Sequence, residues 1–395
     1  MKILNRTTSQ NMPKIGVILF LFAIFYSFKL SFFLNLNDYL VIGVISLGLM
    51  LFYILNQSFF CLNRNSCKVI ALFFIGALLG TRGNFNSYIG ISLLIIPFCF
   101  LVSLKNKYKE SILISFDKIF SILLSISLIT WCLHLINIPL PHYYFEWKGY
   151  YFDNYYFFIR ISDIISFYAF PRFQFIFTEP GYFACLCVFM IYLRGYNFKQ
   201  WQTIVYLIAL ILTFSLSGYI LFFLGLIPFF ITKKQGKSKY IVIFSILIIA
   251  FFFLVMQEQD NVFSSMFAYR LKFENGTMSG YNRTTGGFEH WWSSYFLQDG
   301  NIWWGNNEII ERKFAGEDMI GVDLRVYIAR FGIIPLIFYF GSMFTYYRAN
   351  KTHLGFFFFI LFAIFYYRGY TVMYYMGFPM LYIMGIQLLN KQKTI

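Results

Sequence analysis

The chain has 395 residues, of which 59% are hydrophobic, 23% aromatic and only 12% charged, and its mean hydropathy is +0.64. This composition argues against an ordinary soluble domain and indicates an integral membrane protein. The net charge of +15 is predicted to lie in loops on the cytoplasmic face of a bilayer, so nucleic acid is not expected as a partner.

Twelve apolar segments are candidates for membrane spans, because a bilayer core of about 30 Å needs roughly 20 helical residues. The first follows Lys2, Arg6 and Lys14 and is too long for a typical signal sequence, so it is predicted to be a retained span. The segments are 15–34, 39–60, 68–81, 85–104, 111–137, 178–194, 201–216, 217–232, 240–257, 324–346, 353–367 and 371–390.

Adjacent segments without a polar loop between them are separated by a parity argument. The region 201–232 has basic residues on both flanks; if both flanks are cytoplasmic, the number of crossings between them is even. Ser215, Ser217 and Gly218 supply the break. The same argument divides 68–104 at 81–84 and divides 353–390 at 368–369.

The distribution of charge sets the predicted orientation. With the N-terminus inside, the cytoplasmic segments hold 18 Lys and Arg and one acid, Glu110, whereas the outer segments hold 12 basic and 15 acidic residues. The predicted fold is therefore an all-α polytopic membrane protein of about 12 transmembrane helices. Residues 1–395 form a single membrane domain with both termini cytoplasmic, and 138–177 and 258–323 are large periplasmic loops.

The predicted spans carry few ionisable groups. Lys29, Asp117 and Lys118 each lie near a span end, and the two lysines are expected to extend to the membrane surface. An ion-coupled transporter usually places several charges within its spans, so this scarcity argues against one. Gly76 and Gly80 have the spacing of a small-residue helix-packing seam.

The first outer loop is rich in Tyr and Phe from 143 to 158, which is typical of an aromatic belt at the membrane surface. Its end carries Arg172 and then Thr178, Glu179 and Pro180 at the start of the next span. Pro180 suits the first turn of a helix and Thr178 is the expected N-cap. Glu179 either stabilises the helix N-terminus or acts as a base or substrate ligand at the outer surface.

The stretch from 258 to 330 concentrates the polar chemistry of the chain. It holds 10 of the 17 carboxylates and 4 of the 7 Trp. Here His290 is flanked by Glu289 and by two Trp, which favours a role in proton transfer over a merely solvated imidazole. The Trp pairs either stack on sugar rings or anchor at the membrane surface. The acidic pair Glu317 and Asp318 is interpreted as a solvated turn, so no metal site is predicted.

The chain resembles the O-antigen polymerase family. The resemblance lies in the layout of about twelve spans with two large periplasmic loops and in three short strings: FTEPGYFA at 177–184, LTFSLSG at 212–218 and RFGIIP at 330–335. It implies a glycosyltransferase of the bacterial inner membrane that joins undecaprenyl-diphosphate-linked oligosaccharide repeats at the periplasmic face. It also implies a chain-length regulator and a flippase as partners. No cofactor is expected.

The resemblance also implies roles for particular residues. Arg172, Arg325 and Arg368 lie near outer span ends, where arginine forks would bind the diphosphate of the lipid. Arg283 and Arg330 are the reserve candidates for this role. The base that takes the proton of the attacking hydroxyl is Glu179 or His290.

Two other functions stay open at this point. An O-antigen ligase is expected to have a loop histidine beside Asn, Ser or Gln, whereas His290 is followed by Trp. A flippase or other transporter of lipid-linked oligosaccharide would need polar groups inside its spans. The polysaccharide itself could be O-antigen, capsule or another surface polymer.

Overall fold

The computed structural model describes residues 12–28, 30, 36–80, 95–147, 150–156, 159–162, 171–232, 273–274, 277–278, 285–298, 301–305, 313–314, 317–318, 324–350, 354–363 and 376–394. Within these ranges the chain is mostly helical, as the sequence predicts. The α-helices are α1 (Lys14–Ser27), α2 (Asp38–Leu55), α3 (Arg64–Gly80), α5 (Asn106–Leu135), α6 (Pro180–Leu193), α7 (Trp201–Leu212), α8 (Leu216–Thr232), α11 (Gly286–Trp291), α12 (Leu324–Phe331), α13 (Ile333–Asn350), α14 (Leu354–Phe362) and α16 (Gly377–Thr394). Residues 95–103 are also helical.

The helices follow the apolar segments of the sequence. Every predicted segment contains a helix except 240–257, which lies outside the described residues. The predicted break in 201–232 is confirmed, because α7 ends at Leu212 and α8 begins at Leu216. The breaks predicted at 81–84 and 368–369 also lie outside the described ranges.

Few of the described helices are long. By length and hydropathy, α5 is the one helix in the described part of the chain that could cross a membrane by itself. Helices α12 and α13 meet this criterion only as a pair, and they are bent by 115° at the break between them. The other apolar helices described are shorter.

Helix α6 is the centre of the bundle. All of its residues are buried, and it is apolar on every side, which is the pattern of a helix enclosed by neighbours. It packs against α7, α8 and α16. The approach is close at two glycines: a Cβ at Gly218 would lie 2.7 Å from Ala184 Cβ, and one at Gly385 would lie 2.6 Å from Leu193 Cδ2. The neighbouring helices therefore place glycines where they pack most closely against α6.

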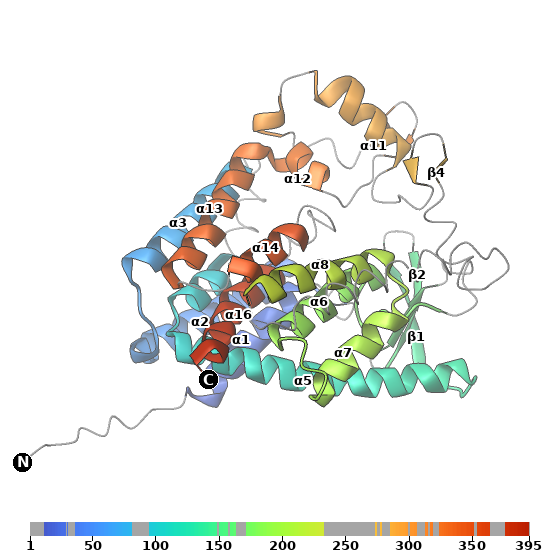
Figure 1. Cartoon of the computed structure of the whole chain (residues 1–395), viewed down its shortest axis with the longest axis horizontal. Helices are drawn as coiled ribbons and strands as arrows, with labels where there is room; N and C mark the ends of the chain where they lie inside the picture. The colour runs from blue at the N-terminus through green and yellow to red at the C-terminus, as the bar shows by residue number, and fades with distance from the viewer. Residues whose placement is uncertain are drawn as a thin grey trace, which may run out of the picture.

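The predicted glycine seam is confirmed between α3 and α13, which lie side by side in Figure 1. A Cβ at Gly76 would lie 2.9 Å from Phe338 Cβ and 3.1 Å from the carbonyl oxygen of Pro335. One at Gly80 would lie 3.2 Å from Cδ1 of Phe331, the last residue of α12, so the seam extends to the end of that helix. The absence of side chains at these two positions lets the helix backbones approach each other.

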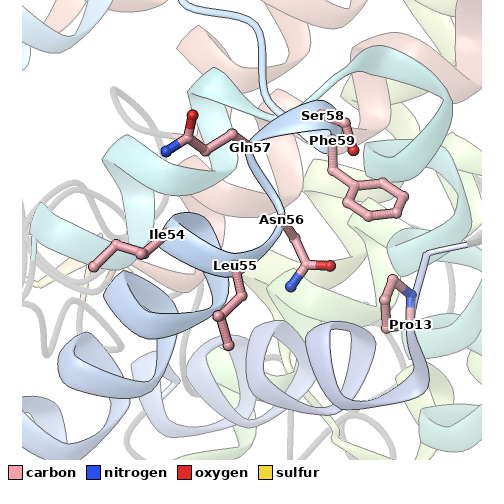
Figure 2. Close-up of a pocket in the computed structure, with 7 residues that line it drawn as sticks. All are labelled: Pro13, Ile54, Leu55, Asn56, Gln57, Ser58 and Phe59. Carbon is pink, nitrogen blue, oxygen red and sulfur yellow. The ribbon is translucent and has the colours of Figure 1, made fainter.

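Several helix ends meet at one end of the bundle, which we call the basal end. It contains the starts of α1, α3 and α5 and the ends of α2, α13 and α16. Phe59 contacts the ring of Tyr108 at 4.9 Å, which joins the end of α2 to the start of α5. Gln387 Nε2 donates to Asn350 Oδ1 at 2.8 Å, which joins α16 to α13. Figure 2 shows Pro13, before α1, beside the residues that end α2.

The first predicted outer loop contains strands, which an all-α fold does not include. Antiparallel strands β1 (His142–Trp147), β2 (Tyr150–Tyr155) and β3 (Ile159–Ser162) form a sheet near the end of α5. The second loop has two short hairpins, β4 (Phe273–Glu274) with β5 (Thr277–Met278), and β6 (Lys313–Phe314) with β7 (Glu317–Asp318). Both predicted outer loops thus have local β structure beside the helical bundle.

A part-buried ion pair joins three helices inside the bundle. Arg194, at the end of α6, pairs with Asp117 of α5, and the two side chains are each 13% exposed. Tyr206 of α7 donates its hydroxyl to Asp117 Oδ1 at 2.9 Å. Asp117, the acidic residue that the sequence places in a predicted span, is therefore paired and hydrogen-bonded, as a charge removed from water requires.

Candidate functional site

The predicted site residues fall into two regions. Arg172 and Glu179 lie in the segment that leads into α6, whereas His290, Arg325 and Arg330 lie on α11 and α12. Figure 1 shows α11 and α12 at the upper edge of the molecule, away from α6 and α7. Arg283 and Arg368, the other predicted diphosphate ligands, lie outside the described residues.

The segment before α6 is held by aromatic packing. Phe173, Phe175 and Phe177 are buried. Phe173 contacts the ring of Trp131 on α5 at 6.0 Å, and Phe175 contacts Phe183 on α6 at 5.8 Å. The Phe-Gln-Phe-Ile-Phe run thus passes between α5 and α6 with its rings in the core, which fixes the two polar residues at its ends.

Arg172 is fastened to the break between α7 and α8. Its Nε donates to the carbonyl oxygen of Thr213 at 2.8 Å, and the next amide, Phe173 N, donates to the carbonyl oxygen of Leu212 at 3.0 Å. A cation is favourable at a helix C-terminus, where carbonyl groups have no partner in the helix. The guanidinium therefore donates to a main-chain carbonyl group at the end of α7, and the adjacent amide of Phe173 bonds to the same turn.

The structure places Glu179 at the N-cap of α6, with Pro180 in the first turn. The expectation that Thr178 is the N-cap is therefore wrong by one residue. Pro180 fixes an extended conformation at the residue before it, and Glu179 has φ −151° and ψ 135°. Its side chain makes no capping hydrogen bond. The carboxylate thus lies at the positive end of the α6 dipole without being used as a cap.

Two of the three strings that carry the family resemblance meet in space. Ala184 ends FTEPGYFA on α6, and Gly218 ends LTFSLSG on α8; these two residues form the close contact between the helices. Ser215 Oγ accepts from Gly218 N at 3.3 Å and so caps the start of α8. The third string, RFGIIP, contacts α3 instead, through Phe331 and Pro335.

The second region is a small apolar cluster between α11 and α12, which we call the outer platform. Thr285 caps α11 by accepting from Phe288 N at 3.4 Å. The cluster consists of Phe288, Trp291, Phe296, Val326 and Ala329, all buried. Val326 and Ala329 are three residues apart and so share one face of α12. Tyr327 and Phe331 pack instead into the main core, so α12 connects the platform to the bundle.

Arg325 is engaged in a two-point ion pair with Glu289. Its Nη1 and Nη2 each donate to one carboxylate oxygen at 2.6 Å. The guanidinium also lies 5.8 Å from the ring of Phe288 and 6.0 Å from that of Trp292. This is the fork geometry that arginine uses for carboxylates and phosphates. A phosphate can bind this fork only by displacing Glu289.

His290 and Arg330 lie on the rims of the platform. His290 is exposed on α11, next to the residue that pairs with Arg325. At 100° per residue, Arg325 and Arg330 lie on either side of the α12 face that Val326 and Ala329 form. The platform thus presents guanidinium groups along both edges of α12 and an imidazole on α11.

A glycine contact seats the platform on the bundle. Gly305 and Gly332 have φ +72° and +86°, in the left-handed region that glycine adopts without strain. A Cβ at Gly332 would lie 2.3 Å from the carbonyl oxygen of Trp303, and one at Gly305 would lie 2.5 Å from Gly332 N. The turn η5 (Asn301–Trp303) therefore rests directly on the α12–α13 break.

Sequence reasoning did not assign roles to Glu289 and Thr213. The sequence shows Glu289 only as a neighbour of His290, and its partner Arg325 lies 36 residues later in the chain. Thr213 acts through its carbonyl oxygen, which any residue supplies. Neither contact has a local sequence signal, although an acid four residues after a Thr N-cap is compatible with a helix start.

Within the described ranges, no three His, Cys, Asp or Glu side chains gather closely enough to hold a metal ion. Comparisons with protein-family models, curated proteins and solved structures find no match to this chain. Its chemistry is therefore argued from its own residues and from the strings described above.

Proposed function

We propose that this chain is a membrane glycosyltransferase that polymerises undecaprenyl-diphosphate-linked repeat units of O-antigen or a similar surface polysaccharide. The observation that carries the proposal is the meeting of FTEPGYFA and LTFSLSG, with Arg172 bonded to the chain between α7 and α8. These two strings lie far apart in the sequence and both resemble the same family. In space they touch each other and lie next to a cation, as expected for parts of one reaction site.

The proposal includes a topology of about twelve spans with both termini cytoplasmic, in the bacterial inner membrane. It is supported by the basal end, where predicted cytoplasmic connections gather: 61–67 and 105–110 meet the end of α13. In the same way, the turn at Trp303 from the second predicted periplasmic loop contacts Gly332 near the start of the span 324–346. Segments assigned to one side by charge thus lie together.

The proposed reaction is a glycosyl transfer at the periplasmic face. A hydroxyl oxygen of one repeat forms a bond to the anomeric carbon of another, the bond from that carbon to the diphosphate oxygen breaks, and the bonding electrons leave with undecaprenyl diphosphate. The hydroxyl proton passes to a base, for which Glu179 and His290 are the candidates. Arginine forks stabilise the charge that develops on the diphosphate.

The contacts distinguish the proposed cations. Arg172 is bound to the carbonyl oxygen of Thr213 beside the contact of FTEPGYFA with LTFSLSG, so it is the first choice for the diphosphate. Arg325 is paired with a carboxylate and would act after exchange of Glu289 for phosphate. Arg330, Arg283 and Arg368 complete the set of candidates.

The test is deletion of the gene in its native strain and separation of the surface polysaccharide by gel. Collapse of the long ladder to core plus a single repeat is expected. Loss of every capped form would instead favour a ligase or a flippase, and an unchanged ladder would contradict a role in this polymer. Complementation with wild type and with Arg172→Ala, at matched protein levels, then tests the assigned cation.

A further inference from the structure

A polar cavity opens at the basal end of the bundle. It has a volume of about 290 Å³ and lies between the starts of α3 and α5 and the end of α13. This size is at the small end of the range for small-molecule sites. The polar side chains in its lining include Asn63, Asn65, Lys105, Asn106, Lys109 and Asn350.

Lys109 is the unusual member of this lining, because it is 2% exposed. Its Nζ donates to the carbonyl oxygen of Val102 at 2.8 Å, lies 3.5 Å from Asn106 Oδ1 and is 5.3 Å from the ring centre of Tyr346. None of these groups is a carboxylate. Among the described residues, no carboxylate pairs with this ammonium. A buried ammonium without a counter-charge is costly, so an anion that entered the cavity would satisfy it.

The rest of the lining also favours an anion. Lys105 brings a second ammonium group, and no Asp or Glu is among the described residues that line this cavity. Asn63 Oδ1 accepts from Ser66 N at 2.8 Å and so caps the start of α3. Because the Asn63 side chain accepts this bond through its oxygen, its NH₂ group can act as a donor toward a ligand. The positive ends of the α3 and α5 dipoles add to the same potential.

A neighbouring hollow provides the contrast. Figure 2 shows it between Pro13 and the end of α2, lined by Ile54, Leu55, Asn56, Gln57, Ser58 and Phe59. None of these side chains is ionisable. The two hollows share the basal end, and only the one beside α5 has ammonium groups in its lining.

We infer that the cavity beside α5 binds a phosphate group, held by the ammonium groups of Lys105 and Lys109 and by amide donors such as Asn63. The inference does not depend on the proposed glycosyl transfer, since the two predicted site regions lie elsewhere in the fold. A soluble phosphorylated compound and the headgroup of an anionic phospholipid offer the same chemistry, so the test has an arm for each.

The protonation of Lys109 gives the site a pH signature. Lys109 precedes the predicted span 111–137, and burial lowers the pKa of its ammonium group from 10.5 to about 7. The titratable groups around it are Cys61, Lys105 and Tyr346. Binding needs the protonated form, so the affinity for an anion of fixed charge should fall about tenfold from pH 6 to pH 8.

The experiment uses the purified full chain. In the first arm, calorimetric titration with inorganic phosphate at pH 6.5 measures the dissociation constant, and sulfate, whose charge is fixed, serves for the pH series. In the second arm, the melting temperature is compared in nanodiscs of phosphatidylglycerol and of phosphatidylcholine. The variants are Lys109→Met and Asn65→Asp, with Lys107→Met as control, since Lys107 is exposed and does not line the cavity.

A saturable response to phosphate that weakens at least tenfold in Lys109→Met and Asn65→Asp, and not in Lys107→Met, supports a soluble ligand. A stabilisation by phosphatidylglycerol alone with the same dependence on the variants supports a lipid headgroup. Asn65→Asp places a carboxylate in the first turn of α3, where it favours the helix, so it stays informative if Lys109→Met does not fold. No response in either arm, or an equal response in all variants, overturns the inference.

Discussion

The interior of the bundle and the outer platform each contain a pair of an arginine and a carboxylate, in different surroundings. Asp117 and Arg194 are each 13% exposed and join α5, α6 and α7. Glu289 and Arg325 are 42% and 29% exposed and join α11 to α12. When one partner of a largely buried pair is removed, the remaining charge is left without compensation. When one partner of an exposed pair is removed, water solvates the remaining charge. The interior pair therefore holds the fold, and the platform pair can exchange partners.

The largest expected effect comes from the interior pair. Asp117→Asn removes the charge opposite Arg194 and should lower the free energy of unfolding by about 3 to 5 kcal/mol. Thermal unfolding of the purified protein measures the loss. Lys118→Met, at the exposed next position on α5, is the control and should change stability by less than about 0.5 kcal/mol. Equal effects of the two variants would contradict the distinction.

The second prediction concerns catalysis and rests on the proposed function. Arg172→Ala should reduce polymer formation roughly 100-fold, about 3 kcal/mol, if this cation stabilises the leaving diphosphate. Arg172→Lys keeps the charge without the fork and should lie between wild type and Arg172→Ala. The gel ladder at matched protein level is the measurement. Full activity in Arg172→Ala would mean that Arg172 has only a structural role, through its hydrogen bond to Thr213.

The third prediction tests the close contact between Gly332 and the turn at Trp303, which joins the outer platform to the bundle. Alanine there must adopt φ near +86° with its Cβ 2.3 Å from a carbonyl oxygen, so we expect a loss of about 1 to 3 kcal/mol. Limited proteolysis of the second predicted outer loop reports on the detachment of the platform. The control is Gly43→Ala, since that position on α2 has nothing within 4 Å of an added Cβ. Alanine in a helix should be neutral or stabilising by up to about 1 kcal/mol.

The smallest expected effect is at the platform pair. A double-mutant cycle of Glu289→Ala and Arg325→Ala should give a coupling in folding stability of about 1 kcal/mol or less, because both groups are substantially exposed. Polymer formation should fall less in Arg325→Ala than in Arg172→Ala. The reverse order would make the platform, and not the segment before α6, the main diphosphate site.

The sequence predicts the helices of this chain well and its contacts unevenly. Apolar length locates the helices, and Ser215 with Gly218 locates the α7–α8 break, because these signals are local. Gly76 and Gly80 also predict their seam, since a small-residue spacing identifies a face of one helix. The strands β1 to β3 escape prediction because their Tyr-rich sequence also suits a membrane belt.

The candidate site is harder to derive, because its contacts join distant parts of the chain. Arg172 bonds to the backbone carbonyl oxygen of Thr213. Every residue type has this group, so the sequence does not predict the contact. The Glu289–Arg325 pair is one of many that the acids and bases of the outer loops could form. Thr178 and Glu179 compete for one N-cap, and the extended conformation before Pro180 decides for Glu179.

The burial of α6 on every side has a consequence for how the protein is made. Three helices that enclose it, α7, α8 and α16, come later in the sequence, and α16 begins only at Gly377. During synthesis α6 leaves the ribosome before its enclosure exists. The tight contact of Leu193 with Gly385 forms only after residue 385 has been synthesised. A chain truncated before 377 would therefore leave one side of its central helix open, and quality-control proteases would meet an apolar surface that the finished protein never shows.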